Sequence, residues 1–251
     1  MAVSIRTITV DDADLHVEER GRGHPLLLLH GMTGVGADFR HLLDLDALAE
    51  SHRVIVPDAR GHGRSTGCSG DLTLAELARD VVAILDALEV PQACAIGLSL
   101  GALTLLHVAT LAPDRVTAMV LVSAAHRFPE ATRVLFREAS LVARSPDEWT
   151  HMRGLHVHGD PQIERLWRLP ARLAEDDIDH RFTVEQLGAI TARTLLVTGD
   201  RDPFYPVEIA VELYRAIPRS SLWVIPDGLH LPVFLAERRA FAGRALEFLH
   251  G

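Results

Sequence analysis

The chain has 251 residues, 48% hydrophobic and 24% charged, and this composition excludes intrinsic disorder as the main state because it supplies enough apolar surface for a core. The 25 Lys and Arg residues against 34 Asp and Glu residues give a net charge of −9, which disfavours nonspecific binding to nucleic acid or to an anionic membrane. This length is typical of one large domain, or of one domain that carries an insertion.

The first half of the chain alternates short apolar runs with helical patterns. Alternating polar and apolar residues at 5–10 and 15–19 predict two antiparallel strands joined by a turn at Asp11 and Asp12. Buried strands are predicted by the apolar runs at 25–29, 54–57, 93–98 and 116–122, and helical spacing occurs at 38–50, 73–88 and 100–111. Strands that alternate with helices are joined by parallel crossovers, so the sequence predicts an α/β fold with helices on both faces of the sheet.

Residues 90–113 contain no Asp, Glu, Lys or Arg, and on length alone they would cross a bilayer. Pro91, Gly97, Gly101 and His107 interrupt this run. We therefore interpret it as a buried strand, a tight turn and a buried helix, and expect no membrane partner.

The pattern changes after residue 125. Residues 126–190 are mainly helical in pattern and rich in charge, and strand signals return at 194–198 and 222–225. We therefore predict a mostly parallel eight-stranded sheet in a core formed by residues 1–125 and 191–251. Residues 126–190 are predicted to form a short helical cap inserted after the sixth strand, with Pro170 between two of its helices.

The two cysteines and the first twenty residues indicate the cellular compartment in which the protein is expected. Cys68 lies in a Gly- and Ser-rich segment and Cys94 in an apolar run, and neither has the C-x-x-C spacing of a metal or redox site. Both are predicted to be free thiols in a reducing compartment. Residues 1–20 lack the apolar stretch of a secretory signal, so we expect a cytoplasmic protein.

A G-x-S-x-G sequence at residues 97–101 carries the strongest chemical signal. It follows a predicted strand and opens a predicted helix, which is the setting of a nucleophile on a sharp turn. The two glycines allow the strand and the helix to approach closely, and the helix N-terminus can stabilise negative charge beside Ser99. We therefore predict that Ser99 is a nucleophile.

A serine nucleophile needs a base that a third group orients. His230 follows the last predicted strand, in the segment Asp227-Gly228-Leu229-His230. Asp200 and Asp202 both follow the preceding strand, and either carboxylate has suitable chemistry. Because the carboxyl ends of parallel strands lie at one edge of a sheet, these groups are expected to lie near Ser99.

The order Ser99, Asp202, His230, each after a successive strand, resembles that of the α/β-hydrolase fold family. Further similarities are Leu29-His30-Gly31-Met32, the loop Asp58-Ala59-Arg60-Gly61-His62-Gly63-Arg64-Ser65, and the acid loop at residues 199–204. The resemblance covers nearly the whole chain and favours Asp202 over Asp200 as the acid. No carboxylate occurs at residues 121–125, the family's alternative acid position, and a serine at position 99 disfavours its aspartate-nucleophile branches.

The resemblance also implies an oxyanion hole formed by the backbone N–H groups of Met32 and Leu100. His30 is a candidate for lining the substrate site, although we expect it to orient its loop rather than to transfer protons, and we interpret His62 in the same way. Four aromatic residues of the predicted insertion, Phe128, Phe136, Trp149 and Trp167, are equally consistent with lining a substrate pocket or with forming a small core of the cap.

His156, His158 and Asp160 form an H-x-H-x-D string that is similar to a metal-binding motif. We attribute it to chance, because it lies in the helical insertion and lacks the further ligands that such a site requires. No metal and no cofactor is expected.

The sequence therefore predicts a serine hydrolase acting on a small to medium, largely apolar ester, thioester or lactone, or on an activated carbon–carbon bond. Two alternatives remain open: a small-molecule sensor that turns over slowly or not at all, and an acyl transferase or perhydrolase. Inward-facing Arg133, Arg137 or Arg153 would instead select a substrate that bears a carboxylate. The sequence gives no sign of a partner surface and leaves the oligomeric state open.

Overall fold

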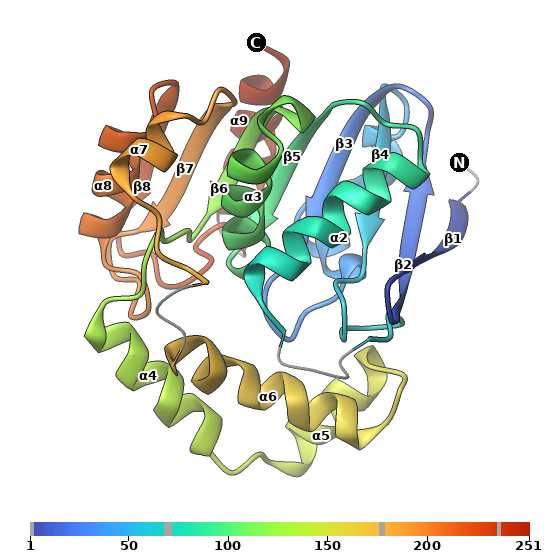
Figure 1. The fold of residues 1–251 in the computed structure, drawn as a ribbon, viewed down its shortest axis with the longest axis vertical. Coiled ribbons are helices and arrows are strands. Elements are labelled where there is room, and N and C mark those ends of the chain that lie inside the picture. Colours follow the sequence, from blue (N-terminus) through green and yellow to red (C-terminus); the bar gives the residue numbers. More distant parts are fainter. Residues whose placement is uncertain (1–2, 68–71, 176–178, 235–236) are drawn as a thin grey trace.

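A computed structural model describes residues 3–67, 72–175, 179–234 and 237–251 (Figure 1). It contains one eight-stranded sheet with the strand order β1-β2-β4-β3-β5-β6-β7-β8. The strands are β1 (Val3–Val10), β2 (Ala13–Arg20), β3 (His24–Leu29), β4 (His52–Pro57), β5 (Ala93–Leu98), β6 (Val116–Val122), β7 (Arg193–Gly199) and β8 (Ser220–Ile225). β2 is antiparallel to both β1 and β4, and the other pairings are parallel, which confirms the predicted sheet.

The register of the central strands brings their carboxyl ends to one edge. Leu29 of β3 pairs with Gly97 of β5, Gly97 pairs with Leu121 of β6, and Leu121 pairs with Leu196 of β7. The residues that follow these strands therefore meet at the same edge, although they are far apart in sequence.

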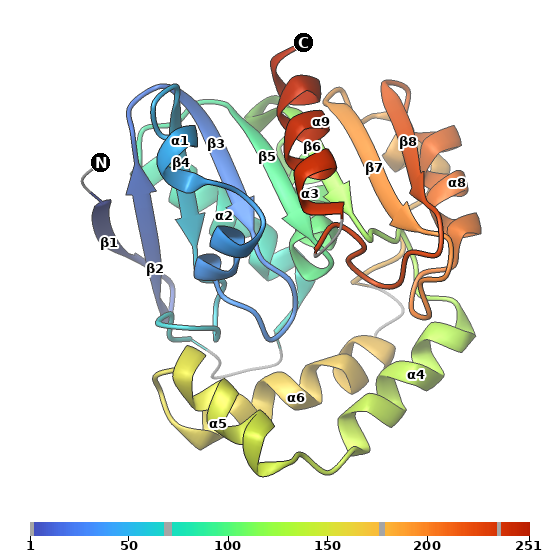
Figure 2. The same ribbon diagram turned by 180° about the vertical axis from the view of Figure 1, so that it is seen from behind.

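Helices cover both faces of the sheet, as Figures 1 and 2 show. On one face lie α2 (Leu74–Ala87), α3 (Leu100–Leu111) and α8 (Val207–Ala216), and on the other lie α1 (Leu45–Leu48) and α9 (Arg238–His250). Each face has its own apolar cluster: Ala78, Leu105 and Leu213 belong to the first, and Phe39 and Phe241 to the second. A short 3₁₀ helix, η2 (Pro113–Arg115), leads into β6.

The helical spacing at residues 38–50 does not form one helix. It is divided into the 3₁₀ helix η1 (Gly36–His41) and the four-residue helix α1. The division follows from Asp44, whose side chain accepts a hydrogen bond from Ala47 N–H and so caps α1. Asp residues favour such caps because their carboxylates satisfy N–H groups that a helix leaves unpaired.

Helices α4 (Glu130–Leu141), α5 (Pro146–Leu155) and α6 (Asp160–Glu175) follow β6 and lie across the carboxyl edge of the sheet (Figures 1 and 2). We call these three the cap helices. The expectation that Pro170 separates two helices is wrong, because it lies inside α6. Buried residues keep one face of α6 continuous on both sides of it: Ile163, Leu166, Leu169 and Leu173.

The remaining helix of residues 126–190 is α7 (Val184–Gly188). Its Leu187 belongs to the same apolar cluster as α2 and α3. This part of the chain therefore packs on the sheet layer rather than with the cap helices.

The charge-free run at residues 90–113 folds as β5 and α3. Within the described ranges, no helix combines the length and the apolar character needed to cross a membrane. Cys94 is a free thiol, whereas Cys68 lies outside the described residues.

Candidate active site

Ser99 lies on the turn between β5 and α3, with a positive φ of 47° that non-glycine residues seldom adopt. Two close approaches make this turn depend on its glycines. A Cβ atom at Gly97 would lie 2.5 Å from the carbonyl oxygen of Gly101, and one at Gly101 would lie 2.2 Å from that of Leu29. The G-x-S-x-G sequence thus holds Ser99 at the carboxyl edge of the sheet.

His230 connects Ser99 with Asp202 through both ring nitrogens. Its Nε2 lies 2.9 Å from Ser99 Oγ, and its Nδ1 lies 2.8 Å from Asp202 Oδ2. A carboxylate accepts hydrogen bonds, so this arrangement favours a proton on Nδ1 and leaves Nε2 free to accept the serine proton. The structure therefore brings the three predicted side chains together in one hydrogen-bonded chain.

The backbone fixes the orientation of the Asp202 carboxylate. Its second oxygen, Oδ1, accepts hydrogen bonds from the N–H groups of Phe204 at 2.9 Å and Tyr205 at 3.1 Å. The Asp202 side chain has no exposed surface, whereas Asp200 is exposed. Only one of the two candidate carboxylates therefore contacts His230.

Ser123 and Tyr205 contact this group, and sequence reasoning missed both. Ser123 directly follows β6 and has a φ of 52°, and its Oγ accepts a hydrogen bond of 3.0 Å from Leu231 N–H, next to His230. The Tyr205 ring meets the His230 ring edge-on at 5.3 Å, and its hydroxyl lies near Ser99. Burial raises the pKa of Tyr205, so this hydroxyl stays protonated near neutral pH. The sequence contained little indication of these two contacts, because both residues lie in loops and contact segments that are distant in the sequence.

Two backbone segments border Ser99 where the oxyanion hole is predicted. Leu100 is the first residue of α3, so its N–H has no acceptor within the helix. Gly31 lies against Ser99, because a Cβ atom there would lie 3.7 Å from Ser99 Cβ. Met32 follows in a turn closed by a 3.1 Å hydrogen bond from Gly34 N–H to the Gly31 carbonyl.

His30 holds this turn in place. Its Nε2 accepts a 2.9 Å hydrogen bond from Ala59 N–H, and its Nδ1 donates to the Gly31 carbonyl at 2.8 Å. Burial lowers the pKa of His30, which keeps the ring neutral. His62 packs against it with ring centroids 5.0 Å apart, and burial also lowers the pKa of His62. Both histidines lie where loops meet.

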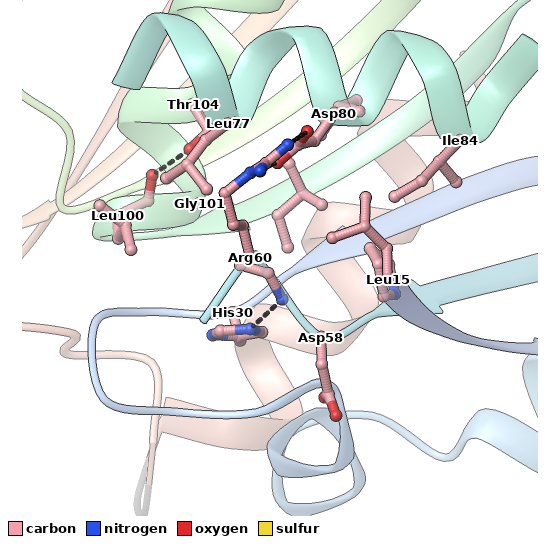
Figure 3. A pocket seen from close by; sticks show the side chains of 14 residues that line it. Leu15, His30, Asp58, Arg60, Leu77, Asp80, Ile84, Leu100, Gly101 and Thr104 are labelled. Carbon is pink, nitrogen blue, oxygen red and sulfur yellow. Dashed lines mark hydrogen bonds and ion pairs between the residues drawn. The ribbon is translucent and has the colours of Figure 1, made fainter. Parts of the chain in front are cut away.

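A small cavity behind His30 and Leu100 is shown in Figure 3. Its volume of about 30 Å³ holds about one water molecule, so it is too small for an organic substrate. The guanidinium of Arg60 lies at its wall and forms two hydrogen bonds, of 2.6 and 2.8 Å, with Asp80 of α2. The Asp80 contact raises the pKa of Arg60, and the pair anchors the loop after β4 to the sheet layer.

The four aromatic candidates divide into two groups. Phe128 and Phe136 belong to an apolar cluster that includes Leu100 and Tyr205. Trp149 and Trp167 instead meet edge-on at 4.5 Å and pack with apolar residues of α5 and α6: Met152, Ile163 and Leu166. The first pair lies next to the Ser99 group, and the second forms a core within the cap helices.

Each arginine of the alternative substrate hypothesis is engaged by protein groups. Arg133 is buried and donates to the carbonyl oxygens of Phe128 and Ala174. Arg137 pairs with Glu130 and Glu175, and Arg153 forms two hydrogen bonds with Asp160. The charges of Arg137 and Arg153 are thus paired with carboxylates of the cap, and the Arg133 guanidinium is held by backbone carbonyls.

The H-x-H-x-D string does not converge on one point. His156 contacts Thr33 and Gly63, His158 contacts the Arg64 carbonyl, and Asp160 pairs with Arg153. In the described part of the chain, no cluster of three His, Cys, Asp or Glu residues is suited to hold a metal ion.

Comparison with known proteins gives concordant results. A family model described as alpha/beta hydrolase fold matches residues 24–142. A protein of Variovorax paradoxus named "Putative carbamate hydrolase RutD" is 30% identical, over 94% of this chain and 96% of the relative. A pimeloyl-[acyl-carrier protein] methyl ester esterase of Vibrio atlanticus is 28% identical, over 91% of this chain and 95% of the relative.

A solved structure agrees over nearly the full length. The crystal structure of a hydrolase from Pseudomonas aeruginosa has a TM-score of 0.79 and 27% sequence identity, and it covers 99% of this chain and 98% of that chain. The similarity therefore extends over the sheet, the cap helices and the loops that carry the site.

Proposed function

This chain belongs to the α/β-hydrolase family, and we propose that it is a serine hydrolase that forms an acyl-enzyme on Ser99. The observation that carries the proposal is the hydrogen-bonded chain from Ser99 Oγ through His230 to Asp202, with distances of 2.9 and 2.8 Å. The names of the relatives support hydrolysis in general. The serine mechanism and the substrate are our proposals.

In the proposed reaction, Ser99 Oγ attacks the substrate carbonyl while His230 Nε2 takes the hydroxyl proton. The Asp202 carboxylate stabilises the charged imidazole, and the N–H groups of Met32 and Leu100 stabilise the oxygen that becomes negative. His230 then protonates the leaving group. In the second half, His230 removes a proton from water while the water oxygen attacks the acyl carbonyl. The bond from the acyl carbon to Ser99 Oγ then breaks, His230 returns the proton to Ser99 Oγ, and the acid is released.

Turnover of a chromogenic short-chain ester tests this proposal. The wild type should give steady turnover that is lost in Ser99→Ala, while Asp200→Ala, at an exposed position, should remain close to wild type. A single slow burst equal to the amount of protein would instead indicate a sensor. Turnover that persists in Ser99→Ala would refute the serine mechanism.

The surroundings of Ser99 support a largely apolar substrate. Leu100, Phe128 and Phe136 share one apolar cluster with Leu169 and Leu173 of α6. This cluster joins the turn that carries Ser99 to the cap helices, so a substrate carbonyl at Ser99 would have apolar side chains beside it. We therefore retain an ester, thioester or lactone of small to medium size as the substrate class.

A series of straight-chain acyl esters measures this apolar contribution. Each buried methylene contributes about 0.8 kcal/mol, or about fourfold in binding. We expect kcat/KM to rise by about fourfold for each added carbon and then to fall once the acyl chain of the substrate reaches the cap helices. A matched series of half-esters provides the control: a flat response to chain length with a strong preference for the half-esters would reject the apolar site.

A further inference from the structure

The H-x-H-x-D string has a role in the fold that its sequence did not indicate. His156 directly follows α5, at its C-cap position, and only 1% of its surface is exposed. It lies between α5 and α6 of the cap, but both of its ring nitrogens contact loops that follow strands of the sheet. The side chain therefore crosses from one layer of the molecule to the other.

The two contacts of His156 fix its protonation. Its Nδ1 accepts a 2.8 Å hydrogen bond from Gly63 N–H, in the loop after β4. Its Nε2 lies 3.0 Å from the Thr33 carbonyl oxygen, in the loop after β3. An N–H only donates and a carbonyl only accepts, so the neutral ring must carry its proton on Nε2. Burial lowers the pKa of His156, which favours this neutral form.

Neighbouring residues of the cap bind only the loop after β4, as far as the described residues go. Gln162 Nε2 donates to the Gly61 and Gly63 carbonyls at 3.1 and 3.2 Å, and His158 Nε2 lies 3.0 Å from the Arg64 carbonyl. Several residues of the cap therefore hold the loop after β4. Among these residues, His156 makes the contact with Thr33, in the loop after β3.

Thr33 occupies a sensitive position. It follows Met32, whose N–H is the proposed oxyanion donor, in the turn closed by Gly34 N–H and the Gly31 carbonyl. Its φ of 60° lies in the left-handed region, which β-branched residues rarely adopt. A conformation of this kind persists only when surrounding contacts hold it.

Histidines hold the turn at both of its ends. His30, from the end of β3, donates to the Gly31 carbonyl, and His156, from the cap, donates to the Thr33 carbonyl. The His62 ring lies between them, with centroids 5.0 Å from His30 and 6.2 Å from His156. One support of the turn thus belongs to the sheet layer and the other to the cap.

We propose that His156 is a positioning residue that couples the docking of the cap helices to the geometry of the oxyanion turn. When the cap is seated, the bond to the Thr33 carbonyl holds the peptide between Thr33 and Gly34, two peptides after the one that carries the Met32 N–H. The turn then keeps the shape in which the Met32 N–H is directed at the carbonyl attacked by Ser99. Loss of this bond releases the turn while the cap remains docked through Gln162 and His158. This inference rests on the proposed serine hydrolase activity.

A pair of substitutions separates the two contacts of His156. In His156→Asn the amide lies near the position of Nδ1, so it retains the contact with Gly63 and loses Thr33. In His156→Gln the longer side chain places its amide near Nε2, so it retains Thr33 and loses Gly63. Each variant loses one hydrogen bond, and a purely structural role predicts similar effects for both.

We expect kcat to follow the Thr33 contact. Removal of an oxyanion donor lowers kcat by about 100- to 1000-fold, so misplacing one in His156→Asn should lower kcat by about 10- to 100-fold, with KM within about threefold. His156→Gln should stay within about fivefold of wild type, and His158→Ala, the control for cap docking, within about threefold. Thermal unfolding of all four proteins identifies any loss that is due to misfolding.

The outcomes separate this inference from the function on which it rests. Equal kcat values for His156→Asn and His156→Gln, a greater loss in His156→Gln, or a loss confined to KM would overturn the positioning role. Wild-type protein without Ser99-dependent turnover of any ester would refute the proposed function itself, and the inference with it.

Discussion

Replacing Asp202 by Asn removes one charge and exchanges one oxygen for an NH₂ group of nearly the same size. The site constrains which way the new amide faces. If its oxygen faced His230, its NH₂ group would lie against the N–H groups of Phe204 and Tyr205, which now donate to Oδ1 at 2.9 and 3.1 Å. Donors would then face donors in a buried site, so we expect the amide oxygen to keep these two bonds.

The opposite orientation places the NH₂ group 2.8 Å from His230 Nδ1. Nδ1 must then accept a hydrogen bond, so the proton moves to Nε2, which can no longer take the proton of Ser99. In a well-studied serine protease the same wrong tautomer costs about 10⁴ in kcat, or about 5 kcal/mol. Because the backbone of the Asp202 loop forces the orientation, we expect a loss of this size here.

The assay compares kcat for one chromogenic ester in wild type, Asp202→Asn and Asp200→Asn. Asp200 lies in the same loop and carries the same charge, but it is exposed, so its variant controls for charge and should stay within about threefold. Thermal unfolding shows whether each variant is folded.

A loss below about tenfold in folded Asp202→Asn would refute the tautomer argument, since the expected effect is about 10⁴. A large loss in Asp200→Asn with an active Asp202→Asn would show that the wrong carboxylate of the loop was assigned.

Three further predictions concern stability. Asp80→Asn removes the buried carboxylate partner of Arg60, which keeps its ion pair with the more exposed Asp12, and should lower the free energy of unfolding by about 1.5 to 3 kcal/mol, measured by urea denaturation; an unchanged midpoint would contradict the anchoring role. Gly101→Ala would place its Cβ 2.2 Å from a backbone oxygen of β3, so we expect little folded protein, and an active, stable variant would contradict the close approach. Burial lowers the pKa of both His107 and His180, so below about pH 6.5 the unfolded chain binds protons that the folded chain does not. The free energy of unfolding should therefore fall on acidification by up to about 1.4 kcal/mol per pH unit for each histidine, and His107→Gln should show a weaker dependence than wild type.

The sequence predicted the parts of the site that depend on neighbouring residues. Ser99 stands between two glycines directly after an apolar strand, and His230 and Asp202 each follow a later strand. In a parallel sheet these positions meet at one edge, so local patterns were sufficient to bring them together. The preference for Asp202 needed the family resemblance, because Asp200 has the same chemistry and lies two residues away.

Contacts between a side chain and a backbone atom far away in the sequence could not be predicted in this way. His156 contacts Thr33 and Gly63, which are 123 and 93 residues away, and nothing in the H-x-H-x-D pattern indicates either contact. Ser123 was missed because its segment, residues 121–125, was considered only for its lack of a carboxylate, yet the Ser123 hydroxyl holds the loop that carries His230. Residue type alone also misplaced Pro170, because the continuous apolar face of α6 outweighs its usual effect on a helix.

The most direct test of the account is to locate the covalent adduct formed by a serine-directed organophosphonate. Intact mass and peptide mapping should show one adduct per wild-type chain, on Ser99, with loss of ester turnover in proportion to labelling. Ser99→Ala should remain unlabelled, and His230→Ala should be labelled far more slowly because the base is missing. An adduct on another residue, or full inhibition without an adduct on Ser99, would contradict the proposal that Ser99 is the nucleophile.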